Sequence, residues 1–153
     1  MAKKTHILWD ETAGVAENAR AQLPPVAAAY FRAGRKLTEG SPSQGLHAFR
    51  LKTKRLRYTL ELFRTCYGPS LEQRLEALRG VQTLLGLIND CAAALRIAAK
   101  SGAPNSPQYR KLERFLQARS AKLIAEFCTH WREKFDAPGQ EDWWVGYLGR
   151  ARR

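Results

Sequence analysis

A row of basic side chains lies in the segment 47–64, HAFRLKTKRLRYTLELFR. Its members recur at spacings of three and four residues, which places them on one side of a helix: His47, Arg50, Lys54, Arg57, Glu61 and Arg64. Only Glu61 is acidic, so the row lacks the partners that usually neutralise a charged helix surface. The chemistry that such a row offers is the binding of a polyanion through charge-assisted hydrogen bonds.

Two apolar rows flank the basic row, on a helix that contains neither proline nor glycine. Beyond the basic row lie Leu51, Tyr58 and Leu62. On its other side is the expected core side of the helix, which consists of Leu46, Phe49, Thr53, Leu56, Leu60 and Phe63. A solvated charged surface usually lies opposite the core, whereas a basic row between two apolar rows predicts an anion-binding groove. A solvated surface is the ordinary alternative.

Length and charge narrow the class of protein. The 153 residues suggest one domain with a core of its own. Lysine and arginine number 26 against 14 aspartate and glutamate, and this net charge of +12 favours nucleic acid, polyphosphate or an acidic membrane surface as partner. Cys66, Cys91 and Cys128 match no disulfide framework and no metal-ligand spacing, which predicts reduced thiols in a cytoplasmic protein. The N-terminus has an apolar run of only three residues, and no uninterrupted run approaches 18, so we expect neither a secretory signal nor a membrane span.

The periodicity predicts an all-α fold, an antiparallel four-helix bundle with a kinked N-terminal helical segment. We expect an N-terminal arm over residues 1–9, the bundle over 10–136 and an aromatic, basic tail over 137–153. Asp10 or Thr12 is the expected cap of a first helix that Pro24-Pro25 ends or kinks. The later helices are predicted over 46–66, over 70–100 with a capping box from Ser70 to Gln73, and over 107–135 with Ser106 as cap.

Polar residues interrupt the apolar sides of the last two long helices. Gln82 and Asn89 lie on a row of leucines, either as buried amides that fix helix register or as partners that orient the basic side chains. Arg119 is placed among Leu112, Leu116, Leu123 and Phe127, where a guanidinium must be paired or must point at an anion, and we favour the anion. His130 is expected to be a hydrogen-bonded core histidine.

Two motifs in this order resemble the CHAD family, the conserved histidine α-helical domain. The first is His47-x-x-Arg50-x-x-x-Lys54-Arg55-Leu56-Arg57-Tyr58. The second is Leu78-x-x-Val81-Gln82-x-x-Leu85-Gly86-x-x-Asn89-Asp90, and the likeness covers roughly residues 10–135. The resemblance implies an all-helical domain that binds inorganic polyphosphate through basic residues.

Family members commonly hold two four-helix repeats in tandem, whereas this chain has the length for one and no second His-x-x-Arg motif. The family's complete binding cavity would therefore need two chains of this length, and we expect self-association as a dimer that doubles the groove. The aromatic tail, with Trp143, Trp144, Tyr147 and Leu148, offers interface surface for the expected homodimer.

We expect Arg50, Lys54 and Arg57 to be the main polyphosphate contacts, with His47, Arg55 and Arg119 secondary. Arg55 points away from the basic row, and its inclusion follows from the family motif. Positions 46–64 span about 27 Å at about 1.5 Å per residue, which is long enough for several phosphates. The expected role is polyphosphate targeting, storage or regulation, beside polyphosphate granules or enzymes of phosphate metabolism.

Two other functions remain open. The charge permits nucleic-acid binding, although no helix-turn-helix signature or aromatic stacking platform accompanies the basic run. His47-x-x-Arg50 also resembles the site of a histidine phosphotransfer domain, but Leu51 stands where those domains have a small residue. The sequence has no glycine-rich phosphate loop, no metal-ligand motif and no paired acids. We therefore expect a binding protein with no catalytic residues, no metal and no cofactor.

Overall fold

The protein is built from five α-helices and one short 3-10 turn, in a computed structural model that describes residues 7–102 and 104–150. The helices are α1 (Val15–Glu39), α2 (Leu46–Leu62), α3 (Ser70–Ser101), α4 (Pro107–Lys134) and α5 (Gln140–Leu148), with the turn η1 (Arg64–Cys66) after α2. No strand occurs in these two ranges, and the all-α prediction is confirmed. Residues 1–6 of the predicted arm and 151–153 of the basic end lie outside the described residues.

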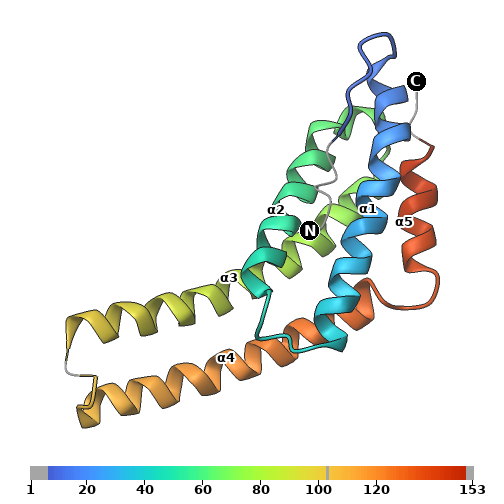
Figure 1. Ribbon diagram of the computed structural model, residues 1–153. Coiled ribbons are helices and arrows are strands. Elements are labelled where there is room, and N and C mark those ends of the chain that lie inside the picture. Colours follow the sequence, from blue (N-terminus) through green and yellow to red (C-terminus); the bar gives the residue numbers. More distant parts are fainter. Residues whose placement is uncertain (1–6, 103, 151–153) are drawn as a thin grey trace.

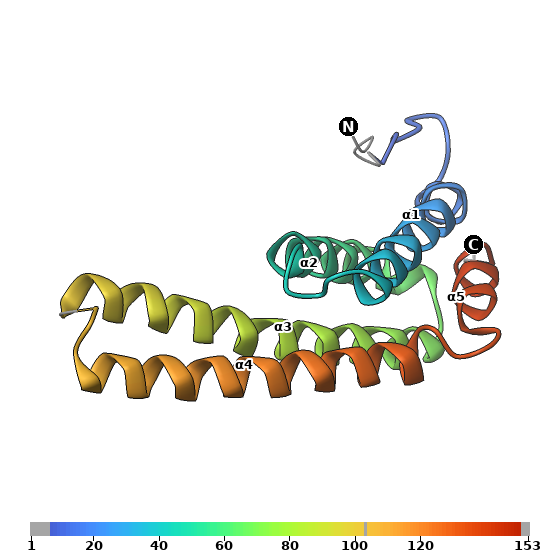
Figure 2. The same ribbon diagram turned by 60° about the horizontal axis from the view of Figure 1, so that its bottom comes forward.

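A long hairpin of α3 and α4 forms one layer, and α2 lies on α3 with α1 beside it (Figures 1 and 2). Helix α5 runs alongside α1. Both views show the far halves of α3 and α4 projecting beyond the ends of α1 and α2. The expected four-helix-bundle arrangement is not confirmed, since α1 and α2 accompany only part of the hairpin.

Helix α1 continues through Pro24 and Pro25, and the prediction that these residues could end it is wrong. A proline inside a helix costs about 3 kcal/mol because it removes a hydrogen bond and crowds the preceding turn. Leu23 and Ala27, on either side of the pair, are fully buried, so tertiary packing holds the helix together across it. The helix also starts later than predicted, with Gly14 as its cap and with the Glu17 carboxylate accepting from the Gly14 N–H at 3.1 Å.

Of the caps predicted for α3 and α4, one is confirmed and one is wrong. Ser106 caps α4, and its hydroxyl accepts from the Tyr109 N–H at 3.1 Å as predicted. The capping box at Ser70 is wrong, because α3 already begins at Ser70 and Pro69 takes the cap position without a side-chain hydrogen bond.

An aromatic core joins the two layers beneath α2. The rings of Trp131 and Phe135 stack at 4.6 Å between centroids, and Phe49 of α2 meets Trp131 edge to face at 5.6 Å. All six residues of the predicted core side of α2 have at most a tenth of their surface exposed: Leu46, Phe49, Thr53, Leu56, Leu60 and Phe63. This packing fixes the rotation of α2, and with it the direction of the basic row.

The aromatic residues near the C-terminus belong to this core. They form α5, where Trp144 and Leu148 are buried and Trp144 meets Phe31 of α1 at 5.6 Å between ring centroids. Because the chain itself covers Trp144 and Leu148, the tail leaves less free surface for a dimer than the sequence suggested, although Trp143 is 41% exposed.

Arg74 is a buried cation that the helical pattern did not single out. It has no measurable exposure, and its guanidinium lies between the rings of Trp143 and Tyr147, at 3.4 and 3.8 Å from their centroids. It donates to the backbone carbonyls of Ser70 and Trp143, at 2.9 and 2.7 Å. Burial lowers its pKa to about 10, so it stays charged at neutral pH and fastens α5 to α3.

Helix α3 is long and apolar enough to cross a membrane by length and composition alone. The sequence shows no uninterrupted apolar run of this size, but an averaged 18-residue window of α3 passes the test. Mostly buried core helices of soluble proteins also pass it; 22% of this window is buried here, and α3 packs against both α2 and α4. The expectation that this chain has no membrane span stays a prediction.

Candidate anion-binding face

The basic row of α2 borders the buried side of that helix. Arg50, Lys54 and Arg57 are half-buried and His47 is exposed. Partial burial holds the stems of these long side chains against the protein. The row is therefore a fixed surface that can meet an anion from solvent.

The second apolar row does not form the far wall of a groove in this chain. Leu51 and Tyr58 are half exposed, and Leu62 is 78% exposed. The expected groove between two apolar rows is therefore not formed by residues 7–102 and 104–150 of a single chain, since this side of α2 stays exposed there.

Helix α3 supplies a polar border to the basic row. Arg57 Nε donates to Gln82 Oε1 at 2.8 Å, and Asn89 lines the same cavity as His47. Both amides are half-buried rather than buried. Of the two interpretations left open for them, the contact of Gln82 supports an amide that orients a basic side chain. We call the α2 row His47, Arg50, Lys54 and Arg57, together with Gln82 and Asn89, the anion-binding face.

Ion pairs neutralise one end of this face. Arg57 Nη1 lies 2.6 Å from Glu61 Oε1, and Arg64 Nε lies 2.9 Å from Glu72 Oε1. Arg79 of α3 approaches three carboxylates, those of Glu61 at 3.7 Å, Glu72 at 3.9 Å and Glu76 at 3.2 Å. Near the C-terminus of α2, positive charge is therefore already paired within the protein.

The opposite end of the face keeps its charge. In the part of the chain that the structure describes, His47, Arg50 and Lys54 make no ion pair. Arg50 Nε is buried and has no hydrogen-bond partner there. A buried donor without a partner costs about 1–3 kcal/mol, so this end of the face carries an unsatisfied group as well as unpaired charge.

The start of α2 adds to the positive potential at this end. Gly45 caps the helix at φ 85°, in the left-handed region that glycine adopts readily, and no side chain caps the first N–H groups. The first turn holds no acidic residue. The positive end of the helix dipole therefore lies beside His47, and no acidic side chain of the first turn offsets it.

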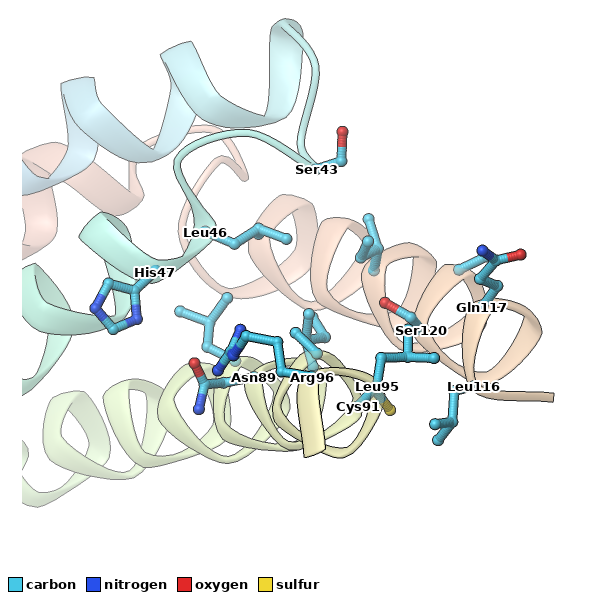
Figure 3. Close-up of a pocket in the computed structure, with 15 residues that line it drawn as sticks. Ser43, Leu46, His47, Asn89, Cys91, Leu95, Arg96, Leu116, Gln117 and Ser120 are labelled. Carbon is cyan, nitrogen blue, oxygen red and sulfur yellow. The ribbon is translucent and has the colours of Figure 1, made fainter. Parts of the chain in front are cut away.

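A cavity of about 650 Å³ opens where the hairpin leaves the bundle (Figure 3). Its floor is apolar, with Leu85, Ile88, Leu95 and Leu116 among its lining residues. At its rim, His47, Asn89 and Arg96 come from two helices and turn toward one another. Arg96 was not among the predicted site residues.

Two predicted residues lie apart from this face. Arg55 is exposed on α2 and makes no ion pair among the described residues. Arg119 is exposed on α4, so its predicted place on the core side is wrong. The buried side of α4 is formed by Leu116, Leu123, Phe127 and Trp131, while Leu112 is 41% exposed, and this shift moves Arg119 into solvent.

His130 is half-buried with its Nε2 at 3.3 Å from the Ala77 carbonyl oxygen, as expected of a hydrogen-bonded core histidine. Cys66 and Cys91 are buried and Cys128 is half-buried, and all three are free thiols. No three histidine, cysteine or acidic residues gather as metal ligands in the residues that the structure describes.

One family of known proteins has a model that matches most of this chain. The family model described as CHAD domain matches residues 4–99, which include the basic row of α2 and most of α3. Neither the curated proteins nor the solved structures contain a match to this chain.

Proposed function

Because the chain belongs to the CHAD domain family, we propose that it binds inorganic polyphosphate through the anion-binding face, as a binding protein rather than an enzyme. The observation that carries the proposal is the unpaired end of the face. There Arg50 and Lys54 have no internal counter-ion among the described residues. The role would be targeting, storage or regulation of polyphosphate.

The chemistry of the face suits a linear phosphate chain. Arg50 offers a planar fork of donors and Lys54 a point charge one helical turn away, so successive phosphates can each meet a cation. Arg57 is held by Gln82 and Glu61 and would contribute a fixed donor rather than a free charge.

The environment of Tyr58 argues against nucleic acid as the ligand. Its ring lies beside the basic row, and the Arg57 guanidinium already covers it at 4.4 Å from the centroid. Base stacking on that side of the ring would have to displace the arginine.

A binding series at graded salt tests the function, with long polyphosphate, short polyphosphate, RNA and DNA as ligands. We expect long polyphosphate to bind tightest at every salt concentration, with affinity falling as salt rises because each contact releases a counter-ion. RNA or DNA that displaced bound polyphosphate fully at equal charge would contradict the proposal and favour a nucleic-acid binder.

We further propose a homodimer whose second chain completes the four-helix arrangement and the anion-binding face. Its support is the uncovered side of α2 and the exposed Ile97, Leu112 and Phe115 on the projecting hairpin. Two chains of net charge +12 repel, so we expect the dimer to strengthen when a polyanion is shared. Light scattering should show a mass that doubles on adding polyphosphate, and a monomer in both states at tens of micromolar would contradict it.

A further inference from the structure

Helix α3 carries a polar row that continues past the end of the anion-binding face. The row keeps spacings of three and four residues over six turns, and its members are Arg79, Gln82, Gly86, Asn89, Ala93, Arg96 and Lys100. Two contacts place it beside the basic row, the hydrogen bond from Arg57 to Gln82 and the cavity that His47 shares with Asn89. As α2 runs back from Arg57 to His47, α3 runs forward from Gln82 to Asn89.

The two rows end at different places. Helix α2 begins at Leu46, next to Asn89, whereas α3 continues to Ser101 along the projecting hairpin (Figures 1 and 2). Arg96 is the first cation beyond this point, and its side chain extends toward Asn89 and His47 (Figure 3). Lys100 follows one turn later.

The cations of α3 beyond Asn89 are available to bind a ligand. Arg96 and Lys100 are exposed, and neither makes an ion pair or a side-chain hydrogen bond within ranges 7–102 and 104–150. Arg79, at the other end of the same row, lies near three carboxylates. An anion on the face is therefore drawn from Lys54 toward His47 and on toward Arg96, away from the acidic end.

We propose that Arg96, continued by Lys100, binds the phosphates that extend beyond His47 and so makes the protein selective for long polyphosphate chains. The seven residue steps from His47 to Lys54 and the seven from Asn89 to Arg96 each correspond to about 10 Å of helix. A short chain can occupy only the first stretch, whereas a long chain reaches both. This inference rests on the proposed polyphosphate function and adds to it the residues that make the affinity depend on chain length.

The test compares wild type, Arg96→Ala and Arg110→Ala with two polyphosphates of defined length, one too short and one long enough to span both stretches. Arg110 is a matched control, since it is also an exposed arginine on the hairpin but lies on α4, outside both rows. We expect Arg96→Ala to weaken binding of the long chain about tenfold and to change binding of the short chain less than about twofold. The slope of log affinity against log salt should fall by about one for the long chain alone.

The outcomes separate the two levels of the proposal. If wild type binds both chains but Arg96→Ala and Arg110→Ala behave alike, or if Arg96→Ala weakens both chains equally, length selection by Arg96 is wrong and the proposed function stands. If wild type binds neither chain at low salt, the polyphosphate function itself fails, and the length selection falls with it.

Discussion

Replacing Arg50 and Lys54 together by alanine is expected to lower the affinity for polyphosphate at least about a hundredfold. Each residue would lose a charge-assisted contact with phosphate, and such a contact contributes about 1.5–3 kcal/mol, or roughly tenfold or more. The effect on the fold should be small, because both side chains are half-buried at the border of the core and the buried side of α2 is left intact.

The matched control is the double variant Arg110→Ala with Arg114→Ala, which removes the same charge from the exposed surface of α4. Fluorescence titration or calorimetry at one salt concentration would measure both doubles, with circular dichroism to check that helix content is kept. If the two doubles lose affinity equally, the basic row of α2 acts only through net charge and is a solvated surface.

Arg57 is expected to matter less than its place in the row suggests. Its Nη1 is paired with Glu61 at 2.6 Å and its Nε with Gln82 at 2.8 Å, so part of its charge is already used. The sequence placed Arg57 beside Arg50 and Lys54 correctly on one side of α2. Whether a cation is neutralised depends on carboxylates from other turns and helices, which the row itself does not reveal.

The burial pattern of α2 could be predicted residue by residue. An uninterrupted helix with apolar residues at spacings of three and four has one side that can join a core, and the predicted side is the buried one. The direction of the basic row follows from that rotation. Helix α4 was harder, because Leu112 and Arg119 fit the same spacing but lie on the side that turns away from α3 and into solvent.

Features that depend on packing between distant segments could not be predicted. The continuity of α1 through Pro24-Pro25 relies on buried neighbours. Trp144 of α5 packs in the core against Phe31 of α1, a contact between residues far apart in the sequence. Arg96 joins His47 only because α2 and α3 run in opposite directions with Gln82 beside Arg57. The spacing from Gln82 through Asn89 to Arg96 was visible in the sequence, but its relation to α2 was not.

Gly34→Ala is expected to lower the free energy of unfolding by about 2 kcal/mol or more. Gly34 is buried in α1, and a methyl group there would overlap the indole of Trp131. That ring cannot easily move aside, since it stacks on Phe135 at 4.6 Å and meets Phe49 at 5.6 Å. Overpacking of a core costs about 1–3 kcal/mol or more, and a rigid obstacle puts this site at the upper end. The gain in helix propensity from glycine to alanine, about 1 kcal/mol, offsets only part of it.

Two other glycines provide a graded comparison by thermal unfolding. At Gly86 of α3 an added methyl group meets no atom within 4 Å, so Gly86→Ala should unfold at the same temperature as wild type or higher. At Gly80 it would come within 2.7 Å of the half-buried His130 ring, which gives an intermediate loss because that side chain has room to shift. Gly34→Ala should unfold roughly 4–8 °C below wild type. If it unfolded together with Gly86→Ala, α1 would be able to move away from Trp131, and the aromatic core would not hold α2 and its basic row as firmly as these contacts indicate.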